Sequence, residues 1–126
     1  MEQLNTIRNL YRSLSDFEVK MDKEFGINMN EAILLHNLAE NGRLSSGEIA
    51  SLLELMPSNT SKVIKSAEGK GLIYRILGNV DKRQMYFSLT PEGHKTLDKM
   101  NGLDLKIPES KLNLIFEITK MLNGFN

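Results

Sequence analysis

The chain has 126 residues, of which 40% are hydrophobic, and its 16 basic and 16 acidic side chains give a formal net charge of zero. Its length predicts a single domain with room for an apolar core. Because the chain has no Cys, disulfides, thiolate zinc sites and cysteine nucleophiles are excluded. No apolar run approaches the roughly 20 residues of a membrane helix, and no secretory signal pattern opens the chain. We therefore expect a cytoplasmic protein with no membrane partner.

The charge is distributed unevenly along the chain. Residues 1–42 hold 4 basic and 7 acidic side chains, residues 43–95 hold 8 and 5, and residues 96–126 hold 4 and 4. Within 57–90, 6 basic side chains stand against 2 acidic ones. Such a positive segment attracts polyanions, nucleic acids among them. The alternative is that these cations only solvate one face of the protein.

A long helix is predicted over residues 2–25, because apolar side chains recur every three or four positions along one stripe. Gly26 is expected to end it. The stripe consists of Leu4, Ile7, Tyr11, Leu14, Phe17, Met21 and Phe25. A stripe of this length on a terminal helix packs either on the domain's own core or on a second chain, and the periodicity leaves both open.

Three shorter helices are predicted next. The first opens with the capping pair Asn28 and Glu31 and runs to about residue 41. Its expected inward side chains are Ile33, Leu34, Leu38 and Ala39. A second capping box, Ser45 with Glu48, opens a short helix that ends near residue 55. The third helix starts at Pro57 and runs to about residue 69, and its expected core-facing side chains are Thr60, Val63, Ile64 and Ala67.

The period of the pattern then changes from helical to extended. Residues 72–77 are rich in β-formers, Gly78-Asn79 predicts a hairpin turn, and Met85, Phe87 and Leu89 alternate with polar or amphipathic neighbours. Thr90-Pro91 then opens a helix to about residue 100. A last helix is predicted from Pro108 to about residue 123, after a segment, 102–108, without a clear pattern. The apolar residues of this last helix cover more than one face, so the helix must be buried from two sides. In a small domain, a second subunit is the natural source of the second side.

Two short helices around the break at Met56-Pro57-Ser58 predict a helix-turn-helix, whose second helix can enter the major groove of duplex DNA. The polar face of that helix holds hydrogen-bonding and cationic side chains that can read base edges or contact phosphates. These candidate DNA contacts are Ser58, Asn59, Ser61, Lys62, Lys65 and Ser66. Free backbone N–H groups near Ser58 also favour a phosphate. The alternative is an ordinary polar surface helix.

The hairpin tip, from Gly78 to Arg83, carries a second cationic group. Lys82 and Arg83 can enter the minor groove of DNA, where narrow A·T-rich stretches attract Arg. Asp81 is close enough in sequence to hold the Arg83 guanidinium in place. The alternative is a solvated tip with a weak surface ion pair, which contributes roughly 0–1 kcal/mol.

These segments resemble the MarR-type winged-helix regulators. The wing signature of that family is Asp-x-Arg, an apolar residue, Leu-Thr and a Gly that enters the next helix, and here it reads Asp81-Lys82-Arg83 followed by 87–93, Phe-Ser-Leu-Thr-Pro-Glu-Gly. The segment 71–73, Gly-Leu-Ile, matches the family's strand entry, and 47–50, Gly-Glu-Ile-Ala, resembles the start of its third helix. The likeness covers nearly the whole chain.

The resemblance implies a mainly α fold with a small β-hairpin, in which a winged helix-turn-helix domain at 28–91 is flanked by dimerisation helices at 1–26 and 92–126. It implies a homodimer that meets a pseudo-palindromic DNA site, and a repressor that releases DNA when a small anionic or phenolic ligand binds. The residues themselves do not distinguish a repressor from an activator. The dimerisation residues expected are Leu4, Ile7, Tyr11, Leu14, Leu112, Ile115, Phe116 and Leu122.

Two other classes of function are weighed against this one. A winged-helix protein-interaction module without DNA binding is the main alternative, and exposed aromatic residues in place of the cations would favour it. An enzyme is not expected, because no Ser/His/Asp arrangement, phosphate-binding glycine loop or pair of catalytic carboxylates is evident. His36 and His94 are isolated, so no metal or other cofactor is expected.

Overall fold

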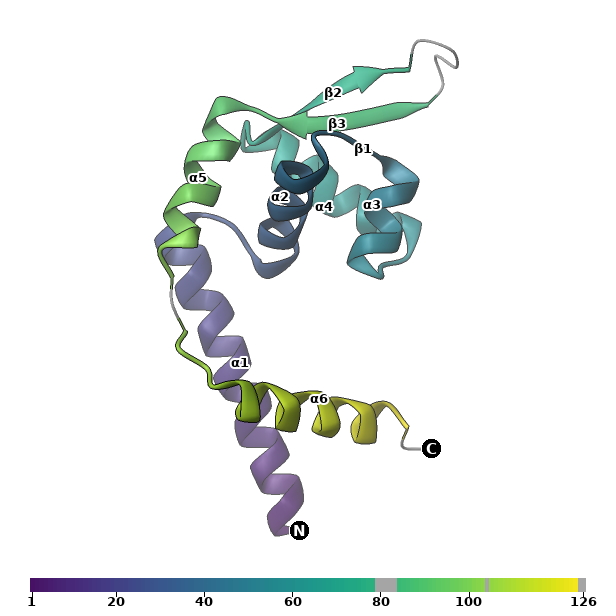
Figure 1. Ribbon diagram of the computed structural model, residues 1–126. Helices are drawn as coiled ribbons and strands as arrows, with labels where there is room; N and C mark the ends of the chain where they lie inside the picture. The colour runs from purple at the N-terminus through teal and green to yellow at the C-terminus, as the bar shows by residue number, and fades with distance from the viewer. Residues whose placement is uncertain (79–83, 104, 125–126) are drawn as a thin grey trace.

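The computed structural model describes residues 1–78, 84–103 and 105–124. Figure 1 shows a cluster of helices beneath a small sheet, from which one long helix extends. The elements in chain order are α1 (Glu2–Phe25), α2 (Met29–Asn41), β1 (Leu44–Ser45), α3 (Ser46–Leu53), α4 (Pro57–Gly69), β2 (Ile73–Leu77), β3 (Met85–Leu89), α5 (Pro91–Asn101) and α6 (Glu109–Asn123). The prediction of a mainly α protein with a β-hairpin is confirmed.

Capping explains where the helices begin and end. Asn28 and Ser45 each accept a hydrogen bond from the backbone N–H three residues on, and the glutamate at that third position accepts one from the cap's own N–H. Thr90 caps α5 by accepting a hydrogen bond from the Gly93 N–H alone, with Pro91 in the first turn of the helix. Gly26, at φ 73°, ends α1 in the left-handed conformation that glycine adopts without strain.

The sheet has three antiparallel strands in the order β1-β3-β2, where the sequence predicted two. The missed strand, β1, is two residues long and pairs Leu44 with Phe87. A strand so short shows no period-two pattern, so sequence reasoning could not detect it. β1 also explains why Ser88 is buried although it alternates with apolar residues, since its hydroxyl donates to the Gly42 carbonyl at 2.7 Å.

One apolar core joins α2, α3, α4, the sheet and α5. The expected inward set of α2 is partly wrong, because Ile33 is 41% exposed and Ala39 is also exposed. Leu35 is 0% exposed instead, and with Leu34, Leu38 and Glu31 it completes an i, i+3, i+4, i+7 stripe rotated from the predicted one. Most of the expected face of α4 is buried, with Val63 at its margin.

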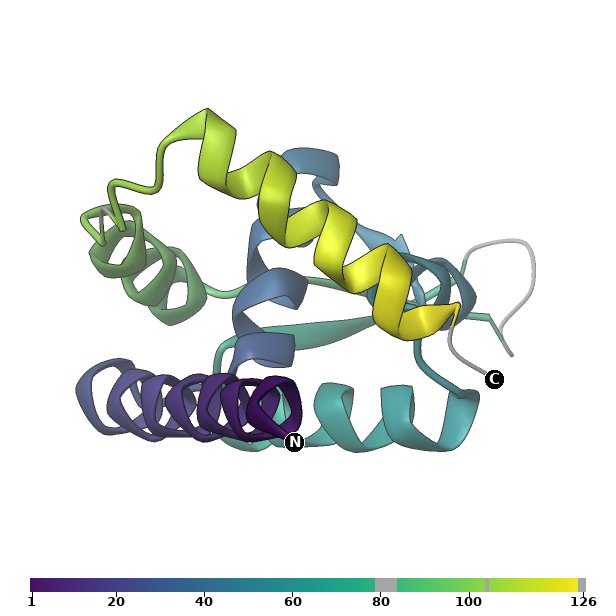
Figure 2. The ribbon, with the colours of Figure 1, turned by 90° about the horizontal axis from the view of Figure 1, so that it is seen from below.

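The two end helices pack on this core very little. Met21 is the only buried residue of α1, and no residue of α6, all of which the structure describes, is buried. Figure 1 shows α6 lying away from the sheet, and Figure 2, seen from below, shows α6 crossing in front of the other elements. No helix among the described residues is long and apolar enough to cross a membrane.

Gly93 in α5 is fixed by close packing. A Cβ atom at this position would clash with the Leu72 carbonyl oxygen and crowd the Leu89 side chain, so Gly93→Ala must displace α5 from the strands. We expect a loss of about 1–3 kcal/mol in the free energy of unfolding, measured by urea denaturation at fixed protein concentration. Gly69→Ala is the control, because nothing lies near its Cβ position, and it should leave stability unchanged or raise it by about 1 kcal/mol. Equal stabilities would contradict this account of Gly93.

Candidate nucleic-acid interface

The helix-turn-helix is formed by α3 and α4. The turn begins at Glu54, which has a left-handed φ of 55°, two residues before the break that the sequence predicted. Thr60 is buried, and its hydroxyl donates to the Met56 carbonyl at 3.0 Å. No side chain of the described residues caps the N-terminus of α4. The phosphate contact expected at its first N–H groups stays a prediction from the sequence.

One side of α4 is buried and the opposite side is exposed. Thr60, Ile64 and Ala67 face the core. At about 100° per residue, Ser58, Lys62 and Lys65 lie on the side that points away from these residues, and all three are exposed. The structure therefore brings together most of the predicted face, with Lys62 near its centre.

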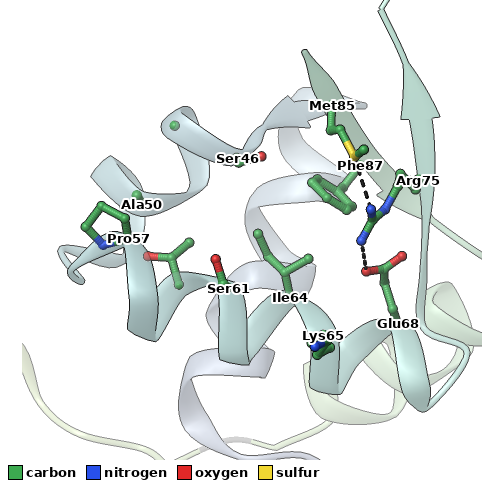
Figure 3. A pocket seen from close by; sticks show the side chains of 12 residues that line it. Ser46, Ala50, Pro57, Ser61, Ile64, Lys65, Glu68, Arg75, Met85 and Phe87 are labelled. Carbon is green, nitrogen blue, oxygen red and sulfur yellow. Dashed lines mark hydrogen bonds and ion pairs between the residues drawn. The ribbon is translucent and has the colours of Figure 1, made fainter. Parts of the chain in front are cut away.

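The predicted face splits at its edges. Ser61 and Lys65 line a cavity of about 350 Å³ between α3, α4 and the strands, with Arg75 and Phe87 on its far side. Figure 3 shows Ser61 and Ile64 of α4 on the cavity side of the helix. Asn59 and Ser66 lie on the other flank of α4, and the Ser66 hydroxyl donates to Glu31 of α2 at 3.0 Å. Sequence reasoning therefore missed the inward contact of Ser66.

A second contact that the sequence did not reveal joins α4 to β2. Arg75 Nη2 donates to Glu68 Oε1 at 2.8 Å, while Nη1 approaches Met85 Sδ at 3.1 Å (Figure 3). The guanidinium lies over the Phe87 ring, 5.6 Å from its centroid. The hydrogen bond that Arg75 donates to Glu68, together with the negative charge of Glu68, raises the pKa of Arg75 above its ordinary value. Seven residues separate this pair in the chain, so no local helical spacing could reveal it.

These pairings decide which cations remain available. Lys70 pairs with Glu31 and Arg75 with Glu68, both at 2.8 Å. Arg43, just before β1, stacks over Tyr86 at 4.7 Å from the ring centroid. Lys62 and Lys65 form no ion pair within the part of the chain that the structure describes. The positive charge of α4 that faces outward is therefore theirs.

The predicted wing-tip contacts, Asp81, Lys82 and Arg83, lie outside the described residues. They stay predictions from the sequence. The base of the wing is described and is formed by β2 paired with β3, from Ile73 opposite Leu89 to Leu77 opposite Met85.

The described residues contain no group of three or more His, Asp or Glu side chains that could hold a metal ion. His36 has only Glu40 nearby, 3.9 Å away on the same exposed face of α2. Together, two helices joined by a tight turn, an outward cationic face on the second and a strand pair beside them define a winged helix-turn-helix protein.

Comparisons with known proteins agree with this class. The model of the MarR family matches residues 25–84. The chain is 33% identical over 106 residues to the uncharacterized HTH-type transcriptional regulator YkoM of Bacillus subtilis. The matched region covers 79% of this chain and 69% of YkoM. The fold of this chain is similar to that of AbsC, a MarR family transcriptional regulator from Streptomyces coelicolor, with a TM-score of 0.72 and 25% identity. The match covers 98% of this chain and 93% of AbsC. The chain also resembles reduced AbfR in a structure bound to DNA, with a TM-score of 0.76, 22% identity and coverage of 97% and 89%.

The chain belongs to the MarR family of transcriptional regulators. The predicted family and fold are thereby confirmed. Membership favours a DNA-binding regulator over the protein-interaction module that the sequence left as its alternative.

The capping box of α3 makes the stability of the helix-turn-helix depend on pH. The Ser45 backbone N–H donates to the Glu48 carboxylate at 2.9 Å, and this bond, together with a smaller effect of the Ser45 hydroxyl, holds the pKa of Glu48 below its ordinary value of 4.5. A lowered folded-state pKa stabilises the protein above pH 4.5, and this contribution is lost as the pH falls through the folded-state pKa.

Glu48→Gln keeps a capping side chain without the charge, so its urea midpoint should fall less than that of the wild type between neutral pH and about pH 3. Glu18→Gln on α1 removes one exposed carboxylate that caps nothing and serves as the control. An identical acid sensitivity of Glu48→Gln and the wild type would show that the capping carboxylate contributes nothing.

Proposed function

We propose that this regulator is a homodimer that binds a pseudo-palindromic site in duplex DNA and represses transcription without catalysing a reaction. The observation that carries the proposal is the outward face of α4, where Lys62 and Lys65 are exposed and form no ion pair with any described residue. A regulator of this kind works where the chromosome lies, so the proposal includes a cytoplasmic location.

The proposal gives α4 the role of reading helix. Its 13 residues make it about 20 Å long, and the major groove, about 12 Å wide, accepts one helix. Ser58, Asn59 and Ser61 would meet base edges or sugar-phosphate, while Lys62 and Lys65 would reach phosphates or guanine edges. Arg83, with Lys82 and Asp81, would enter the minor groove from the wing.

The dimer is proposed from the apolar surface of the end helices. All eight expected dimerisation residues are exposed in the single chain, Tyr11 at 72% and Phe116 at 64%. Ile7, Ile118, Met121 and Leu122 line an open hollow between α1 and α6. A contiguous apolar surface of this kind marks an interface, and a two-fold dimer would cover it with the same helices of a second copy. Residues 1–26 and 92–126 would supply the dimer contacts, although Leu97 of α5 also belongs to the main core.

The fold shared with AbfR, whose structure holds DNA, supports the proposed activity. Release by a small anionic or phenolic ligand stays a prediction from the family resemblance. The DNA-binding experiment starts with selection of bound duplexes from a random pool, which would supply the site, its symmetry and a probe for the measurements that follow.

Lys65→Met tests the reading helix. Because each of the two subunits of the proposed homodimer loses one phosphate contact, the slope of log affinity against log salt should fall in magnitude by about 2, and binding to every duplex should weaken. Fluorescence anisotropy over a salt series measures both quantities. Lys99→Met on α5 removes an exposed lysine from another surface and should leave the slope unchanged. The proposal for α4 would be wrong if Lys65→Met and Lys99→Met behaved alike.

Phe116→Asp tests the dimer. A carboxylate in an apolar interface has no partner there, so we expect dimer dissociation to be favoured at least about tenfold, measured by sedimentation equilibrium. Circular dichroism should stay the same, because Phe116 contributes nothing to the core. Val19→Asp, at an equally exposed apolar position off the α1 stripe, is the control. A wild-type protein that sediments as a monomer would contradict the proposed dimer.

A further inference from the structure

The described chain contains one fully buried carboxylate, that of Glu31 in the first turn of α2, which is 0% exposed. It accepts three hydrogen bonds. The Asn28 backbone N–H and Lys70 Nζ donate to Oε1 at 3.0 and 2.8 Å, and the Ser66 hydroxyl donates to Oε2 at 3.0 Å. One of these donors, Ser66, belongs to α4 and another, Lys70, is the C-cap residue of α4, and they lie 35 and 39 residues away in the chain.

A buried carboxylate is costly unless its charge is paired and its oxygens are hydrogen-bonded. Capping α2 explains only the bond from Asn28, and an exposed glutamate makes that bond equally well, as Glu48 does in α3. The burial of Glu31 therefore reflects its contacts with α4. Each of these contacts has a direction, unlike the apolar contacts of Ile64 and Ala67, which tolerate small rotations of the helix.

The hydrogen bonds from Ser66 and Lys70 to Glu31 hold one flank of α4. Ser66 and Lys70 are one helical turn apart, so both reach the same carboxylate. On the opposite flank, Glu68 is held by Arg75 of β2. The last two turns of α4 are thus fixed from both sides, and the face left between the two flanks carries Lys62 and Lys65.

We propose that Glu31 is a positioning residue that sets the rotation of α4 about its axis, and with it the direction in which Lys62 and Lys65 meet DNA. Lys70 serves this purpose and is not a phosphate contact, although it is basic, lies at the end of the reading helix and is 38% exposed in its side chain. The inference rests on the proposed DNA binding and adds a residue to it that cannot touch DNA.

The salt dependence separates a positioning role of Lys70 from a phosphate contact of Lys70. Ser66→Ala and Lys70→Met should each weaken binding to the selected site about tenfold, because α4 loses its alignment with base edges. Affinity for random duplex DNA and the salt slope should stay the same, because no phosphate contact is lost. Lys65→Met, which should lower the slope, is the matched control on the same helix.

Rescue provides a second readout. Lys70→Met leaves the Glu31 charge buried without its partner, so adding Glu31→Gln should restore stability and part of the affinity for the selected site. Glu31→Gln alone keeps the capping oxygen and should shift the amide NMR signals of residues 62–70 but not those of α6. Ser66→Ala keeps the positioning test valid if Lys70→Met fails to fold.

The outcomes are distinct. A salt slope lowered by about 2 in Lys70→Met, with equal losses on selected and random DNA, would make Lys70 a phosphate contact in both subunits and overturn the inference. If Ser66→Ala and Lys70→Met both bound the selected site with unchanged affinity, the inference about Glu31 would be overturned as well. The proposed function would remain, because the wild-type protein would still bind duplex DNA. A wild-type protein that binds no duplex would overturn the proposed function first, and the inference with it.

Discussion

Everything that this protein presents to DNA depends on α4 being packed by one side only. Ile64 and Ala67 are buried against the core that α2 and the sheet share, and burying a side chain of the size of Ile contributes about 1.5–3 kcal/mol. Because an α-helix repeats every 3.6 residues, fixing this side fixes the opposite one. The cationic side of α4 is therefore exposed as a consequence of how the core forms, and the proposed role of Glu31 is to set the rotation that this apolar packing leaves open.

Ion pairs add direction to that packing more than they add stability. The Glu68–Arg75 pair is partly exposed, and pairs of that kind contribute about 0–1 kcal/mol. The Glu31 cluster is buried, so its Coulomb attraction is largely offset by the loss of hydration. Both pairs nevertheless bind basic residues of the positive segment, Arg75 and Lys70. Among the described residues of this segment, the positive charge without an ion pair therefore lies on α4, at Lys62 and Lys65.

Sequence reasoning succeeded where the determining interactions are local. Caps such as Asn28 and Thr90 act within three residues, and the buried side of α4 follows from a single helical period. It failed where the partner is distant in the chain. The two residues of β1 form a strand only because β3 lies beside them. Ser66 contacts α2 only because its hydroxyl donates to Glu31 on that helix. The stripe of α2 was misjudged for the same reason, since a helix with apolar residues on several sides takes its orientation from its neighbours.

The core fixes the position of α4 within one chain, whereas the apolar surface of α1 and α6 would fix how two chains are arranged in the proposed dimer. The reading helix packs in a core whose buried residues run from Ile27 to Leu97 of a single chain, with Phe25 and Met100 packed against it. The distance between two reading helices, in contrast, would depend on α1 and α6, which bury almost nothing in that core. In the proposed dimer, a change in the angle of those helices would alter the spacing of the two reading helices while each winged helix-turn-helix keeps its internal geometry. The affinity for a two-part DNA site would then respond to the dimer interface without any loss of the contacts that recognise each half.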